Sequence, residues 1–272
     1  MSDYQYLTVD RDGPITTVTI SRPEVYNALH PPAHWEFDEV FNAFRDDPEQ
    51  WIAIITGAGD KAFSAGNDLK YQAEGVGPRD RPATGFAGLT FRYDLDKPVI
   101  AAVNGFAMGG GFEIALACDI IVASENAIFA LPEPRVGLAA LAGGVHRLPR
   151  AIPLKRAMGM MLTGGRASAA EGEHLGFVNE VTPVGEALAG AKRWAGKIME
   201  CSPMSIRATK QASMRGLGAG TIQDAIETVY PAVRALHGSE DTSKARKRSP
   251  KNARRTGKAA DAGAFPILTP SG

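Results

Sequence analysis

The chain has 272 residues, of which 44% are hydrophobic and 22% are charged. This composition is typical of a globular protein that buries a large core, and no apolar run is long enough to cross a bilayer. The start of the sequence lacks the basic and apolar pattern of a signal peptide, so we expect a cytoplasmic protein. Cys118 and Cys201 are too few for a disulfide framework, and no Cys/His spacing predicts a metal site.

The formal net charge is zero, but the charges are unevenly distributed. Residues 243–272 contain eight basic side chains and one acidic side chain, which leaves 22 basic and 29 acidic residues in the preceding part. A basic segment of this kind can bind nucleic acid or a membrane surface. A solvated tail is the simpler interpretation, and we adopt it.

The first part of the chain alternates short apolar runs with turns. Residues 15–20 are rich in β-branched side chains and predict a strand, whereas the apolar spacing of residues 33–46 predicts an amphipathic helix. Short apolar runs at 51–56 and 98–103 predict buried strands. Residues 72–88 contain many glycines and prolines, which favours a loop that shapes a pocket.

The second part is richer in predicted helices. A glycine-rich turn is expected at 105–111, a helix at about 111–117 and a strand at 120–123. Further helices are expected at 151–163, 169–176, 185–200 and about 203–216. Recurring strand–strand–helix units within an α/β protein fit a layered spiral better than a doubly wound sheet.

Small residues crowd the segment 61–69, directly after the strand predicted at 51–56. Small side chains allow a ligand to approach the backbone and leave N–H groups available as donors. An ordinary turn explains this segment equally well when it is considered alone.

Three successive glycines, at 109–111, open the helix that carries Glu113. The free N–H groups and the dipole at a helix start favour negative charge, such as the charge that develops on a thioester oxygen. The spacing does not match a phosphate-binding loop. Tight packing of strand against helix is the alternative, with Glu113 as an acid stabilised by the dipole.

Glu133 lies between Pro132 and Pro134 in the otherwise apolar segment 129–138. Burial of this carboxyl group would raise its pKa and suit it to proton transfer. A surface acid paired with Arg135 is the alternative.

Taken together and in order, these three segments resemble the crotonase superfamily, also called the enoyl-CoA hydratase/isomerase superfamily. Supporting stretches lie at 22–29, 97–105, 117–121, 162–166 and 176–179, and the resemblance runs from about residue 5 to about residue 241. It implies an α/β fold, a crotonase-like spiral of ββα units followed by a C-terminal helical region used for trimerisation. We therefore expect a spiral core over 1–195, a helical region over 196–242 and an atypical basic tail over 243–272.

The resemblance also implies the positions of the site. The oxyanion hole would consist of the backbone N–H groups of Asn67 and Gly110. The substrate would be a coenzyme A thioester, with no permanently bound cofactor. The positions that match the CoA-binding segments of the family are Val25, Ala28, Ala65, Gly66, Asp68 and Leu69.

Hydratases of the family carry both glutamates, so the resemblance implies an enoyl-CoA hydratase of fatty acid metabolism. Glu113 would hold the water, and Glu133 would be the principal acid/base. Carnitinyl-CoA dehydratase, enoyl-CoA isomerase and aromatic enoyl-CoA hydratase-lyase are the alternatives. A crotonase-fold RNA-binding protein is an alternative of another class, which the presence of both acids disfavours. The resemblance implies a homotrimer or a hexamer formed by two trimers. It implies no membrane partner.

Two features depart from the pattern of fatty-acid hydratases. The segment 138–149 lacks the proline often found before its Gly-Gly pair, and its Val-His-Arg-Leu-Pro part resembles carnitinyl-CoA dehydratases. His146 in this segment would be a proton shuttle or, more simply, a structural histidine. The loop 70–92 would decide the acyl group through its aromatic residues, Tyr71, Phe86, Phe91 and Tyr93.

The tail departs most from the family ending. Suitable codons for residues 243–257, read one base out of phase, give Glu-Gly-Pro-Lys-Ala-Phe-Ala-Glu-Lys-Arg-Ala-Pro-Asn-Trp, which resembles that ending. We therefore expect a frameshift near Ser243. Re-reading the gene tests this hypothesis, and an in-phase frame without the family-like alternative would refute it.

Overall fold

The computed structural model describes residues 4–75 and 80–239, and the basic tail at 243–272 lies outside them. The larger sheet has six strands in the order β1-β2-β3-β5-β7-β10. β1 and β2 are antiparallel, and every other neighbouring pair of this sheet is parallel. The strands of this sheet are β1 (Leu7–Asp12), β2 (Ile15–Ile20), β3 (Ile52–Gly57), β5 (Val99–Val103), β7 (Ile120–Ser124) and β10 (Glu180–Thr182).

The second sheet has four short strands in the order β4-β6-β8-β9. Three times in succession the chain passes from a strand of the larger sheet to the next strand of the smaller one: β3 to β4, β5 to β6 and β7 to β8. A helix follows each pair, which confirms the predicted spiral of ββα units. The strands of the second sheet are β4 (Ala62–Ser64), β6 (Phe106–Met108), β8 (Ile128–Ala130) and β9 (Arg166–Ser168).

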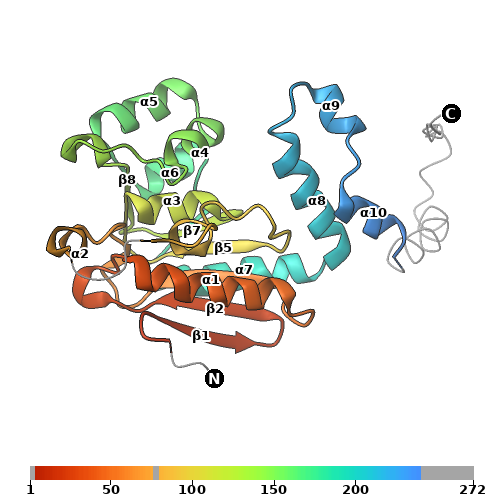
Figure 1. The fold of residues 1–272 in the computed structure, drawn as a ribbon, viewed down its shortest axis with the longest axis horizontal. Coiled ribbons are helices and arrows are strands. Elements are labelled where there is room, and N and C mark those ends of the chain that lie inside the picture. Colours follow the sequence, from red (N-terminus) through yellow and green to blue (C-terminus); the bar gives the residue numbers. More distant parts are fainter. Residues whose placement is uncertain (1–3, 76–79, 240–272) are drawn as a thin grey trace.

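Helices cover both faces of the larger sheet, which explains why its central strands are apolar on both faces. α7 (Ala187–Met199) packs on one face, where its alanines meet Ile54, Ile100 and Val122. α1 (Pro31–Asp46) lies on the other side with its row of buried phenylalanines (Figure 1). The predicted boundary between residues 195 and 196 falls within α7.

The remaining helices lie between and beyond the sheets. α8, α9 and α10 extend away from the sheets, and α10 packs against α8 (Figure 1). No helix in the described ranges is long and apolar enough to span a membrane. The bounds of these helices are η1 (Pro23–Val25), α2 (Leu69–Glu74), η2 (Phe86–Gly88), α3 (Gly110–Ala117), η3 (Glu133–Val136), α4 (Gly144–Ala151), α5 (Leu154–Thr163), α6 (Ala169–Leu175), α8 (Pro203–Gly216), α9 (Ile222–Glu227) and α10 (Pro231–His237).

Three local predictions were incomplete. Part of the loop expected at 72–88 is helical, because the Asp68 side chain caps α2 by accepting a hydrogen bond from the Tyr71 N–H. The helix expected at 151–163 begins only at Leu154, after Pro153, and Ala151 is instead the last residue of α4. The glycine-rich turn expected at 105–111 contains β6, whose strand character comes from pairing with β4 and β8.

Candidate active site

Glu113 lies in the first turn of α3, and its side chain is almost completely buried. The N–H of Gly144, the first residue of α4, donates a hydrogen bond of 2.9 Å to Glu113 Oε1. Burial raises the pKa of the Glu113 carboxyl to about 7; the hydrogen bond from Gly144 opposes this, and the charge of Glu133 assists it. Near neutral pH this group therefore exchanges protons readily.

Glu133 opens η3 on the other side of the α3 N-terminus. A Cβ atom at Gly109 would lie 2.9 Å from Glu133 Oε1, so the carboxylate sits directly over a glycine whose φ is +53°. Glu133 Oε2 is buried and has no hydrogen-bond partner among the described residues. Burial raises the pKa of this carboxyl group as well. Arg135 does not pair with it, because its Nε donates to the Thr163 carbonyl instead, at 3.0 Å.

The buried Glu113 carboxyl and the partly buried Glu133 carboxyl, both with a raised pKa, thus lie beside the start of α3. The charge of Glu133 adds to the rise in the pKa of Glu113, so a deprotonated Glu133 favours the protonated form of Glu113. Such a pair supplies a proton donor and a proton acceptor at the same pH.

The turn at 65–67 lies directly against the start of α3. A Cβ atom at Gly66 would lie 2.5 Å from the Met108 carbonyl oxygen and 2.8 Å from the Gly110 nitrogen. Within residues 4–75 and 80–239, no protein acceptor takes the N–H of Asn67 or of Gly110. Both of these predicted oxyanion donors are therefore available to a ligand.

The segments predicted to bind CoA are joined to each other by backbone hydrogen bonds. The Leu29 N–H donates to the Gly66 carbonyl at 2.7 Å, and the Asp68 N–H donates to the Leu29 carbonyl at 2.8 Å. The Ser64 hydroxyl also donates a hydrogen bond of 2.8 Å to the Asn27 carbonyl. The structure therefore places the six predicted CoA-binding residues on two adjacent segments, at Val25, Ala28, Ala65, Gly66, Asp68 and Leu69.

Asp68 has internal partners that sequence reasoning missed. Its carboxylate forms an ion pair of 3.0 Å with Arg22 and caps α2 through Tyr71. Although burial opposes it, these two contacts hold the pKa of Asp68 below its usual value. Asp68 therefore shapes the 61–69 turn, whereas Leu69 beside it is half exposed.

Among the four aromatic residues expected to shape the pocket, Phe86 reaches the site. A Cβ atom at Gly110 would lie 2.7 Å from the Phe86 ring, so the ring covers this glycine. Tyr71 instead packs edge-on against His30, while Phe91 and Tyr93 are exposed. Phe86 thus forms a wall beside one oxyanion donor.

Sequence reasoning singled out the segment 138–149 but missed its link to Glu113. The Gly143–Gly144 pair was the sequence signal that could have revealed this link. A Cβ atom at Gly144 would lie 3.1 Å from Glu113 Cγ, so the absence of a side chain at Gly144 lets Glu113 approach α4 closely. The His146 side chain is exposed and forms no hydrogen bond with the described residues. Both roles considered for it stay predictions.

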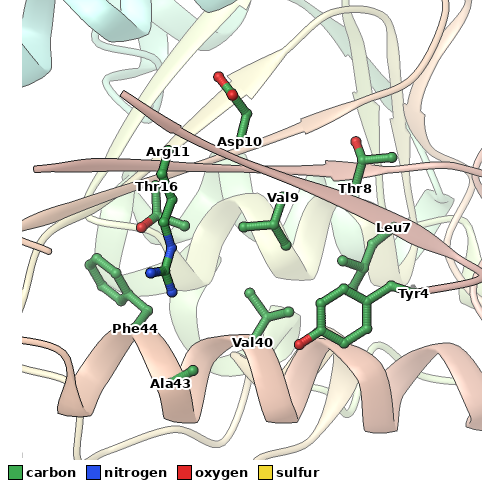
Figure 2. A pocket seen from close by; sticks show the side chains of 10 residues that line it. All are labelled: Tyr4, Leu7, Thr8, Val9, Asp10, Arg11, Thr16, Val40, Ala43 and Phe44. Carbon is green, nitrogen blue, oxygen red and sulfur yellow. The ribbon is translucent and has the colours of Figure 1, made fainter. Parts of the chain in front are cut away.

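The site is distinct from a cavity of about 580 Å³ between β1 and α1 (Figure 2). That cavity is lined by residues such as Leu7, Val9, Val40 and Phe44, and by none of the predicted site residues. No group of three or more His, Cys, Asp or Glu side chains in the described structure could hold a metal ion.

Comparisons with known proteins show which sequences and solved structures resemble this chain. The sequence pattern of a family described as enoyl-CoA hydratase/isomerase matches residues 10–250. A carnitinyl-CoA dehydratase of Salmonella enteritidis is 49% identical over 212 residues, which cover 78% of this chain and 80% of that protein.

Solved structures are similar over most of their length. An enoyl-CoA hydratase from Mycobacterium tuberculosis H37Rv superimposes with a TM-score of 0.84 at 32% identity, covering 91% of this chain and 96% of that one. A carnitinyl-CoA hydratase from Mycobacterium avium has a TM-score of 0.74 at 40% identity, covering 77% and 81%.

Proposed function

The chain belongs to the enoyl-CoA hydratase/isomerase family, and from this premise we propose that it adds water reversibly across the double bond of a 2-enoyl-CoA thioester. The observation that carries the proposal is the meeting of Glu113 and Glu133 at the start of α3. Both carboxyl groups have a raised pKa, and two available N–H groups lie beside them.

In the proposed reaction, the thioester oxygen accepts hydrogen bonds from the N–H groups of Asn67 and Gly110. These donors stabilise the negative charge that develops on this oxygen as water attacks C3. Glu113 holds the water and takes its proton, while protonated Glu133 donates a proton to C2. One proton enters and one leaves, so a proton exchange between the two glutamates and solvent restores the starting state.

The substrate would arrive as a coenzyme A thioester, without a permanently bound cofactor. Its pantetheine arm would pass the joined segments 25–29 and 62–69, whose glycine and alanine residues leave backbone groups accessible. We further propose a cytoplasmic homotrimer or a hexamer of two trimers, assembled through the C-terminal helical region.

Carnitinyl-CoA dehydratase is the second candidate, because the relatives that share 49% identity carry this name. It removes water from a β-hydroxyacyl thioester and therefore uses the same acid and base in the reverse direction. The two candidates differ in the group that the acyl chain carries beyond the reacting carbons.

A substrate panel distinguishes the candidates. Purified protein is given crotonyl-CoA, carnitinyl-CoA, a 3-enoyl-CoA and an aromatic enoyl-CoA, and the enoyl absorbance and the products are followed. Preferred hydration of crotonyl-CoA supports the first candidate, and preferred dehydration of carnitinyl-CoA supports the second. Double-bond migration or carbon–carbon cleavage would identify an isomerase or a lyase. Absence of turnover, with salt-dependent RNA binding that requires residues 243–272, would overturn the proposal.

A further inference from the structure

Arg147 connects two parts of the candidate site that are distant in sequence. It lies on α4, the helix whose first residue, Gly144, holds Glu113. Its Nη2 atom donates a hydrogen bond of 2.7 Å to the carbonyl oxygen of Thr90. The guanidinium therefore ties α4 to the segment 84–92.

Thr90 in turn holds the wall of the site. Its Oγ1 atom accepts a hydrogen bond of 2.8 Å from the Phe86 N–H, and the Phe86 ring covers Gly110. One chain of contacts thus runs from the glutamate that would hold water, through Gly144, Arg147 and Thr90, to the glycine that would bind the thioester oxygen.

We propose that Arg147 is a positioning residue for the hydration reaction, which fixes the Phe86 wall relative to Glu113 and presents its guanidinium charge to the site from α4. The inference rests on the proposed function for its catalytic consequence. The contacts themselves are independent of any substrate.

The charges around both groups support this role. Glu113 faces the carboxylate of Glu133 from η3 and the guanidinium of Arg147 from α4. Arg147 faces Tyr93, Cys118 and Glu113, and it forms no ion pair within the described residues. The guanidinium of Arg147 lowers the pKa of Glu113, in opposition to the larger effect of burial and to the charge of Glu133.

Other contacts hold the segment 84–92 when Arg147 is changed. Arg92 donates to the Gly88 carbonyl at 2.6 Å and pairs with Asp38 at 2.7 Å. The Ala87 N–H donates to His34 Nδ1 at 3.2 Å. These anchors should let a variant at position 147 fold while its link to Thr90 is lost.

The first test needs no substrate. The carboxyl stretch of Glu113 is titrated by infrared difference spectroscopy, with Glu113→Gln used for assignment. In Arg147→Met the Glu113 midpoint should rise, because removal of an opposite charge disfavours the carboxylate. Arg147→Lys should restore most of the shift. Arg150→Met is the matched control: Arg150 is on the same helix, and its guanidinium donates to the His146 carbonyl.

An unchanged midpoint in Arg147→Met would overturn the inference, as would an equal rise in Arg150→Met. If Arg147→Met fails to fold by circular dichroism, Arg147→Gln replaces it, since glutamine keeps a donor without the charge. Failure of the proposed function is seen separately, as the absence of crotonyl-CoA turnover by the parent protein.

The second test uses turnover at several pH values. In Arg147→Met, kcat at pH 7 should fall at least about twofold, because a higher pKa leaves a smaller fraction of Glu113 ionised. The loss should shrink as the pH rises, and KM should change little. A loss of kcat that is independent of pH would contradict the charge role of Arg147.

Discussion

Glu113 illustrates at the scale of one residue how a site and a fold can conflict. Glu113 is 3% exposed, and its carboxylate accepts backbone hydrogen bonds that offset only part of the loss of water. Ionisation of this buried group therefore costs more free energy than ionisation of a carboxyl group in water. Its folded-state pKa of about 7 lies above the ordinary value of 4.5. Its contribution to stability is therefore fully present below the unfolded pKa and is lost as the pH rises through about 7.

Glu113→Gln should for this reason stabilise the protein at alkaline pH. Glutamine keeps the acceptor for the Gly144 N–H and carries no charge, so the free energy of unfolding at pH 8 should increase by up to about 3 kcal/mol. At pH 4 the two proteins should be nearly equal. Urea unfolding at both pH values, at one protein concentration, measures the difference. A stabilisation that is the same at both pH values would contradict the assigned pKa.

Gly109 provides a second test at this scale. Gly109→Ala places a methyl group 2.9 Å from Glu133 Oε1, so we expect Glu133 to move and kcat for enoyl-CoA hydration to fall at least about tenfold. Gly176→Ala is the control, because Gly176 also has a positive φ, +98°, but has open space around it. Steady-state kinetics of both variants separates the collision from backbone strain. Equal losses of kcat would contradict the placement of Glu133.

At the scale of elements, α2 depends on Asp68. Asp68→Ala removes the α2 cap and the Arg22 ion pair, so the 61–69 turn should loosen, KM for an enoyl-CoA should rise at least about fivefold, and kcat should change less. Ser168→Ala is matched to it, because Ser168 caps α6 and its loss should cost about 1 kcal/mol without affecting KM. Thermal unfolding and steady-state kinetics of both variants test this. Unchanged KM in Asp68→Ala would contradict the role of the turn.

The elements also show how much the sequence could predict. Short, uninterrupted apolar runs identified β3, β5 and β7, because strands buried on both faces are apolar throughout. The three-residue strands β4, β6, β8 and β9 escaped detection, since their strand character comes from pairing with distant segments. α4 was missed because its amphipathic character is confined to eight residues.

The same distinction holds for the site. Glu113, Glu133 and the glycine triplet could be predicted because they occur in recognisable local patterns. Arg147 and Thr90 are 57 residues apart in the sequence, and Phe86 and Gly110 also lie on different segments. No local sequence pattern encodes either contact. Asp68 was assigned to CoA, and its pairing with Arg22 likewise became evident only in the folded chain.

At the scale of the whole molecule, the projecting helices α8–α10 expose large apolar side chains. Ile222 and Ile226 on α9 are 78% and 76% exposed, which is costly in water for a single chain. We expect sedimentation velocity to give the mass of three or six copies of the 28.8 kDa chain. Ile222→Asp/Ile226→Asp should shift the distribution to smaller species, whereas Gln223→Lys on the same helix should not. A single-chain mass for the parent at micromolar concentration would contradict the expected assembly.

In the proposed function, Glu113 and Glu133 act as one acid/base pair. Crotonyl-CoA hydration by Glu113→Gln and Glu133→Gln measures this directly. Glu125→Gln, an exposed position, is the control. Loss of a positioned acid or base should lower kcat by about 100-fold or more in each site variant while the control keeps the parent rate. Turnover within about threefold of the parent in either site variant would contradict the account.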